Sequence, residues 1–249
     1  MRTRLLLAGL VAMGALGAWA VAGLPDFGKP RGAYGTTAIA LSLQQRHTTN
    51  TVSAITFDIR GIDTLGEELI LFCAVIGAAL LLRAQRRHGR EAEAAEEREA
   101  ARAQLSPSLR ALGALLAGPL LVLGGYVVAH GALTPGGGFQ GGVILASALI
   151  LTFAAGQMMS LRRVSPVSVL ELAEAAGAAA YALVAIGGLV FAAAAMANFL
   201  PIGTQGSLLS GGTIPVLNVA VGVEVASGVT LILTELLDQA LLGGGEEVA

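Results

Sequence analysis

Apolar residues occur in this chain as long runs that are separated by short polar or glycine-rich segments. Six of these runs approach the ~20 residues that an α-helix needs to cross ~30 Å of hydrocarbon at ~1.5 Å per residue. The pattern therefore predicts six transmembrane helices: Leu5 to Leu24, Thr64 to Leu82, Leu109 to Ala129, Phe139 to Met159, Val169 to Phe191 and Ile214 to Leu237.

Composition supports the same class. Hydrophobic residues make up 55% of the 249 residues and charged residues 13%, and the 34 glycines exceed the ~7% usual in globular proteins. We expect an all-α, polytopic integral membrane protein. The net charge of -2 gives no reason to expect a nucleic-acid partner. The single cysteine, Cys73, lies inside an apolar run, so the chain has no internal disulfide framework.

The arginines predict the orientation. If six helices span the membrane, both termini, the segment from Arg83 to Arg110 and the Arg162-Arg163 loop share one face. That face carries eleven basic residues, and only Lys29, Arg31, Arg46 and Arg60 fall on the other. Because basic residues favour the cytoplasmic side, both termini are expected in the cytoplasm.

The first run has an alternative interpretation. Arg2 and Arg4, the apolar residues after them and the small-residue pattern Ala18-Trp19-Ala20 also fit a secretory signal with a cleavage site. Removal of this helix would leave the next segment without its preceding anchor but would not alter the later orientation.

Two polar segments separate the apolar runs in the first half of the chain. The longer one, from Pro25 to Arg60, contains the stretch 48–51 (Thr-Thr-Asn-Thr), which could cap a short helix or form a surface turn. The other alternates arginine and glutamate with alanine from Arg83 to Arg102, which predicts a solvated helix or a tether. We take the second as a boundary: a two-helix unit (residues 1–82), a charged cytoplasmic linker (83–108) and a four-helix unit (109–249).

The most specific stretch is a glycine-rich hairpin at residues 130–142, between the third and fourth runs. Its backbone cannot continue a regular helix, and it must turn tightly or lie against another backbone. Apolar residues resume at once with Val143, which favours a close-packed turn over a flexible surface turn. The residues expected to form it are Pro135, Gly136, Gly137, Gly138, Gly141 and Gly142.

Glu224 is the deepest carboxylate within a predicted span. An ionised carboxylate near the bilayer centre costs ~2.5–3.5 kcal/mol or more, so it needs a partner, a proton or water. Glu224 lies midway along the last run among residues small enough for another helix to approach closely: Gly222, Ala226, Ser227 and Gly228. We interpret it as part of a proton or cation route.

Four other carboxylates lie closer to span ends. Glu171 and Glu174 share one helical face near the start of the fifth run, and Glu67 and Glu68 stand near the start of the second. For Glu68 and Glu171 a position at the headgroup level, where the carboxylate reaches water, is favoured. Glu67 and Glu174 stay candidates for the ion route.

His130 is the remaining candidate for the ion route. It could titrate near neutral pH, or it could serve only as a hydrogen-bonding residue at a helix end. The three histidines lie in separate segments and no nucleotide loop, metal-ligand cluster or nucleophile with its base is present in the sequence. We therefore expect no catalytic residues, no bound metal, no cofactor and no enzyme activity of the chain acting alone.

Two stretches resemble the MnhB/MrpB component of Mrp-type multisubunit Na+/H+ antiporters over roughly Leu109 to Leu237. They are residues 130–146, which contain Thr-Pro-Gly-Gly-Gly-Phe-Gln-Gly-Gly, and residues 210–224, which run from Ser-Gly-Gly-Thr-Ile-Pro to Glu224. Upstream, residues 24–28 (Leu-Pro-Asp-Phe-Gly), 50–55 and 57–67 look like the E component of membrane-bound hydrogenases, which is equivalent to the last part of the large A component of the antiporter. This second resemblance argues that the first helix is retained.

The resemblance implies a natural fusion of an E-like and a B-like unit that works inside a larger complex. That complex is either a stand-alone monovalent cation/proton antiporter or a complex I-related respiratory assembly with the same module. Its implied partners are A-, C- and D-like membrane proteins and the lipid bilayer, its transported ions are Na+ or H+, and its location is the prokaryotic cell membrane. The alternative is a purely structural protein of such a complex, whose carboxylates only bond helices together. An independent permease is disfavoured because no paired halves are apparent.

Overall fold

The computed structural model describes residues 2–24, 33–86, 107–154 and 167–243. Its regular elements within these ranges are all helical, with no strand among them. The contacts divide the chain into two units, residues 1–39 and residues 40–249. The first unit contains α1 (Arg2–Ala22) and the first half of α2 (Ala33–Gln44), and every side chain described in α1 is exposed.

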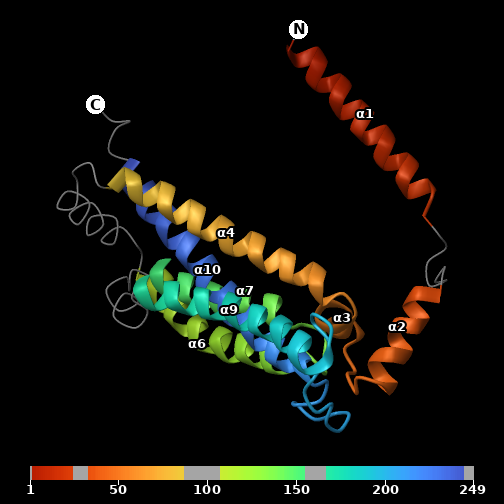
Figure 1. Cartoon of the computed structure of the whole chain (residues 1–249). Helices are drawn as coiled ribbons and strands as arrows, with labels where there is room; N and C mark the ends of the chain where they lie inside the picture. Colours follow the sequence, from red (N-terminus) through yellow and green to blue (C-terminus); the bar gives the residue numbers. More distant parts are fainter. Residues whose placement is uncertain (1, 25–32, 87–106, 155–166, 244–249) are drawn as a thin grey trace, which may run out of the picture. The chain divides into compact units, whose positions relative to one another are not determined.

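The described part of the second unit contains a bundle of five long helices: α4 (Gly61–Arg86), α6 (Pro107–Ala129), α7 (Gly138–Ala154), α9 (Val167–Ala192) and α10 (Thr213–Gly243). α10 contacts all four of the others (Figure 1). In addition, α6 packs along α7, and α9 packs against α4. α10 is also the most buried of the apolar helices, and Ile214, Leu217 and Val225 are completely enclosed. The bundle is therefore built around its last helix.

Among the described residues, four helices are long and apolar enough to cross a membrane: Gly61–Leu82, Arg110–Ala129, Val167–Ala192 and Thr213–Leu236. The other two predicted spans also fall on apolar helices, but the described apolar parts, Leu7–Ala22 and Gly138–Thr152, are shorter. The predicted six apolar runs thus correspond to helices, and length alone supports four of them as spans. The outer faces of these helices carry many exposed large apolar side chains, as a helix surrounded by lipid requires.

A short irregular segment leads into α4. Asn50 caps α3 (Thr51–Ala54) by accepting a hydrogen bond from the Ser53 backbone, so the predicted capping role of residues 48–51 is confirmed. The π-helix η1 (Ile55–Ile59) follows and ends where the Arg60 amide bonds to the Ile55 carbonyl at 2.8 Å. This segment turns the chain into α4 and places Phe57 in the bundle core.

Most of the predicted charged linker lies outside the described residues, as do the Arg162-Arg163 loop and the last six residues of the C-terminal tail. The domain boundaries at 82 and 108 stay predictions. Within the second unit, however, residues 40–86 and 107–243 share a single core, since Phe57 and Tyr181 join the same buried cluster as Leu217 and Val225.

Candidate functional site

A carboxylate from each of three contacting helices is buried inside the bundle. Glu68 comes from α4, Glu174 from α9 and Glu224 from α10, and these residues are 5%, 3% and 0% exposed. We call these three residues the carboxylate cluster. The Glu224 carboxyl lies within electrostatic range of both the others, and it approaches that of Glu68 most closely.

Glycines bring the helices that bear the carboxylates close to their neighbours. Gly177 of α9 packs so tightly on α10 that an added Cβ would lie 2.7 Å from the Cβ of Glu224. On α10, an added Cβ at Gly228 would lie 3.5 Å from Oε1 of Glu174 and 3.0 Å from Cγ2 of Val75 on α4. These small residues let the three backbones approach, which shields the carboxylates from the surroundings of the bundle.

The cluster lacks the hydrogen bonds that buried charges ordinarily have. Apart from the close approach of the Glu68 and Glu224 carboxyl groups to each other, both carboxyl oxygens of Glu224, Oε2 of Glu68 and Oε1 of Glu174 have no hydrogen-bond partner among the described residues. The neighbouring Ser227 hydroxyl does not serve them, because it donates to the backbone carbonyls of Val223 and Glu224. Like charges this close together and this poorly solvated repel one another strongly, so the cluster favours taking up a proton or a cation.

The other two predicted ion-route residues, Glu67 and His130, are not buried in this cluster, and neither is Glu171, which the sequence predicts at the headgroup level. Glu67 and Glu171 are exposed, and each lies within electrostatic range of the cluster member on its own helix. His130 is half-buried at the end of α6, where its ring stacks on Tyr126 with centroids 3.9 Å apart and its Nδ1 lies 3.1 Å from the Tyr126 carbonyl oxygen. The structure thus brings together Glu224 and Glu174, and it leaves Glu67, Glu171 and His130 outside.

Glu68 is the member that sequence reasoning placed elsewhere, at the headgroup level. A usable signal was present in the helical register of α4. Gly61, Thr64 and Glu68 recur at intervals of three and four and are all buried, so they share the inward face, whereas Glu67 lies off it.

Beside the cluster, the glycine-rich hairpin is held by two asparagines. The Asn50 side-chain amide donates to the carbonyl of Gly131 at 2.8 Å and to that of Thr134 at 2.9 Å, and a weaker contact of 3.4 Å reaches the Gly136 carbonyl. The Asn50 backbone amide donates to the Ala132 carbonyl at 3.1 Å. Residues 40–60 therefore bind the turn between α6 and α7 through its otherwise unpaired carbonyls.

Asn218 of α10 holds the other side of the hairpin. Its Oδ1 accepts the backbone N–H of Gly138 at 2.9 Å, and its amide donates to the Ser53 hydroxyl and the Ile214 carbonyl, each at 3.0 Å. Gly137 has φ +144° and Gly136 φ +131°, and an added Cβ at Gly137 would lie 2.8 Å from Oδ1 of Asn218. The turn is close-packed and needs glycine at both positions.

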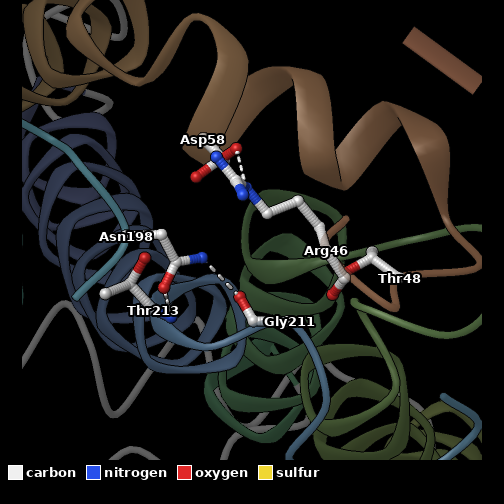
Figure 2. A network of polar contacts seen from close by, with 6 residues as sticks. All are labelled: Arg46, Thr48, Asp58, Asn198, Gly211 and Thr213. Atoms are coloured by element: carbon white, nitrogen blue, oxygen red, sulfur yellow. Dashed lines mark hydrogen bonds and ion pairs between the residues drawn. The ribbon is translucent and has the colours of Figure 1, made fainter. Parts of the chain in front are cut away.

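A third polar network closes the same end of the bundle (Figure 2). Nε of Arg46 donates to Asp58 at 2.6 Å, and the buried Thr48 hydroxyl donates to the Arg46 carbonyl at 3.1 Å. Asn198 accepts the backbone N–H of Thr213 at 3.0 Å and donates to the Gly211 carbonyl at 2.8 Å, so it caps the start of α10. These contacts fix the segment between α2 and α4 and the loop between α9 and α10.

Residues 108–231 match the model of a family described as a domain related to the MnhB subunit of Na+/H+ antiporter. The chain is 31% identical over 199 residues to the uncharacterized protein MJ1307 of Methanocaldococcus jannaschii, across 73% of this chain and 74% of that protein. The chain belongs to the same family as this archaeal protein and carries an MnhB-related domain.

Two solved structures are similar. One is a chain in the structure of the membrane-bound sulfane sulfur reductase, an archaeal respiratory membrane complex: TM-score 0.74, 28% identity, 95% of this chain and 99% of that one. The other is a chain in the structure of the Mrp complex from Dietzia sp. DQ12-45-1b: TM-score 0.71, 21% identity, 95% of this chain and 26% of that one, which shows a shared fold. Together with the apolar helices, these likenesses indicate a membrane protein.

The extent of the MnhB-related domain divides the site. Glu174 and Glu224 lie inside residues 108–231, and Glu68 lies before them. Because the likeness to the sulfane sulfur reductase chain covers 95% of this chain, it reaches well beyond the domain into the preceding helices. The carboxylate cluster is therefore completed by a residue that the MnhB-related domain alone does not contain.

Proposed function

We propose that this chain is a membrane component of a multisubunit monovalent cation/proton antiporter of the Mrp type, or of a respiratory complex that contains the same module. The MnhB-related domain and the membrane complexes among its structural neighbours support the class of complex. In this proposal the chain moves no ion by itself but supplies part of a Na+ or H+ route beside A-, C- and D-like proteins in the cell membrane, with no cofactor of its own.

The observation that carries the proposal is Glu224. Its carboxyl group is completely enclosed, its oxygens have no hydrogen-bond partner among the described residues beyond the closely approaching carboxyl group of Glu68, and Glu174 is a further buried carboxylate nearby. A group with only a structural role gains nothing from such a site, because a buried charge without a partner is destabilising. A carboxylate that accepts and releases a proton or cation needs this kind of site.

The test is Glu224→Gln in the whole complex, with cation-dependent proton flux measured in vesicles and normalised to intact complex. Glutamine keeps the size of the side chain but carries no charge and exchanges no proton. We expect normal assembly and a loss of flux of about tenfold or more, the change produced by ~1.4 kcal/mol in the barrier. Glu224→Ala should lose at least as much, since it also opens a cavity.

Glu171→Gln is the matched control, because Glu171 is an exposed carboxylate one turn from the cluster. It should reduce flux much less. Normal flux in Glu224→Gln would instead support the second candidate function, a purely structural role in the complex. That alternative is favoured by the hairpin contacts of Asn50 and Asn218, which show how strongly the chain ties its own helices together.

We propose further that residues 1–82 form an E-like unit with two spans, so that six helices cross the membrane with both termini in the cytoplasm. The arginine distribution supports this orientation. In a Cys73→Ser background, single cysteines at Ala94 and Ala249 should resist an impermeant thiol reagent in intact cells. A cysteine at Gln205, which is exposed in the loop before α10, should react. Labelling at Ala94 from outside would refute the six-span arrangement.

A further inference from the structure

Tyr181 continues the line of the carboxylate cluster along α9. The buried face of α9 presents Glu174, Gly177, Ala178 and Tyr181, so the tyrosine lies two turns after the glutamate on the same stripe. Its side chain is completely enclosed, and its hydroxyl donates to the backbone carbonyl of Gly61 at 3.1 Å. Tyr181 therefore reaches α4 at its first residue.

The buried face of α4 lies opposite Tyr181. Gly61, Thr64 and Glu68 share the buried face, and the Tyr181 hydroxyl lies close to the Thr64 hydroxyl and within electrostatic range of Glu68. The Thr64 hydroxyl donates its own proton to the Thr56 carbonyl at 2.9 Å, so its oxygen is left to accept. The single Tyr181 proton thus has several acceptors within the same buried region.

The surroundings of Tyr181 are otherwise apolar. Its ring packs on Phe57 with centroids 6.2 Å apart, and both rings belong to the core that contains Ala54, Ile214 and Leu217. At the end of the bundle where α4 begins, the hydroxyl is a polar group at the edge of this core, next to Thr64. It therefore lies near the buried face of α4 that carries Glu68.

The geometry points to Tyr181 as a positioning residue that controls access to Glu68 from the end where α4 begins. In the structure its hydroxyl is held by the Gly61 carbonyl, and Oε2 of Glu68 has no hydrogen-bond partner among the described residues. When Glu68 is ionised, its charge competes with the Gly61 carbonyl for the hydroxyl proton, with the Thr64 hydroxyl between them. When Glu68 is neutralised, the bond to Gly61 is the favoured one. This inference rests on the proposed function.

The experiment is Tyr181→Phe in the whole complex, assayed as cation-dependent proton flux in vesicles after a sodium pulse. Phenylalanine keeps the ring and its packing on Phe57, so the complex should assemble, with its thermal midpoint lowered only slightly by the loss of the single bond to Gly61, while flux per complex falls about fivefold or more. The control is Tyr126→Phe, which removes the hydroxyl of a half-exposed tyrosine on α6 and should leave flux unchanged. Flux in Tyr181→Phe equal to that of the control would overturn the inference.

A double-mutant cycle with Glu68→Gln separates a positioning role from a merely structural one. If Tyr181 acts through Glu68, adding Tyr181→Phe to Glu68→Gln should slow flux by less than about twofold further, because interacting residues are not additive. Full additivity would overturn the inference. If Tyr181→Phe does not assemble, Thr64→Val replaces it in the cycle at nearly equal volume, and the same two outcomes decide.

The outcome is distinguishable from failure of the proposed function. Normal flux in Glu224→Gln removes the ion route altogether. Slow flux in Glu224→Gln together with normal flux in Tyr181→Phe keeps the route and removes only the control by Tyr181.

Discussion

The hairpin and the carboxylate cluster are both buried polar regions that meet on α10, but they differ in how many of their polar atoms have hydrogen-bond partners. At the hairpin, the side-chain oxygen and nitrogen of Asn50 and of Asn218 all have hydrogen-bond partners. In the cluster, the oxygens of Glu224 have no such partner among the described residues beyond the approaching carboxyl group of Glu68. A satisfied polar network rigidifies a core, whereas an unsatisfied one is costly and persists where function requires it. We therefore assign assembly to the hairpin and ion handling to the cluster.

The largest effect on assembly is expected from Gly137→Val. The Gly137 backbone has φ +144°, and an added Cβ would lie 2.8 Å from Oδ1 of Asn218. A side chain in this conformation costs on the order of 1–3 kcal/mol, and the clash adds to it. The yield of intact complex after size-exclusion chromatography should fall to background. Gly125→Val on α6, where an added Cβ meets nothing within 4 Å, is the control that should assemble. Normal yield of Gly137→Val would mean that the hairpin is a permissive turn.

Asn218→Ala should have the next largest effect. It leaves the Gly138 N–H and the Ser53 hydroxyl without their partner inside the bundle, at about 1–3 kcal/mol for each unsatisfied group. We expect a clearly lowered thermal midpoint of the purified complex and unchanged flux in the complex that remains.

The matched control is Asn198→Ala, which removes an asparagine of similar bonding from the start of α10. Asn198 is only half-buried and acts as a cap, so its loss should cost about 1 kcal/mol and lower the midpoint less. Equal shifts for the two variants would show that Asn218 is no more than a second helix cap.

The periodicity of the sequence predicts the helices well because each long apolar run has one way to satisfy its backbone in lipid. It also identifies Glu224 and the glycine-rich turn, since a mid-span carboxylate and a cluster of glycines stand out without any tertiary information. The capping role of Asn50 follows from residue type alone. These features are local, so the sequence carries them directly.

The remaining features depend on contacts between distant segments. That Asn50 would bind the carbonyls of residues 131–136 follows only from the fold, as does the proximity of Glu68 to Glu224 across α4 and α10. The π-helix at Ile55–Ile59 could not be predicted from the periodicity of apolar residues. For Glu68, closeness to the span end outweighed the helical face on which it lies, and the face proved the more informative of the two.

The smallest effect is expected from Gly228→Ala, which perturbs the cluster without removing any of its groups. The added Cβ would lie 3.0 Å from Cγ2 of Val75 and 3.5 Å from Oε1 of Glu174, so the Val75 side chain has to shift by a few tenths of an ångström, and α10 moves away from α4 if it cannot. Assembly should be retained, since Gly→Ala inside a helix itself gains up to ~1 kcal/mol. Flux per complex should fall only about twofold, the change for ~0.4 kcal/mol in the barrier.

The control is Gly77→Ala on α4, where an added Cβ meets nothing within 4 Å, and it should have normal flux. If Gly228→Ala matches Gly77→Ala in flux while Glu224→Gln is slow, the spacing between α10 and α4 at Gly228 does not limit ion movement, and the carboxyl group of Glu224 matters more than the exact separation of the helices that carry the cluster.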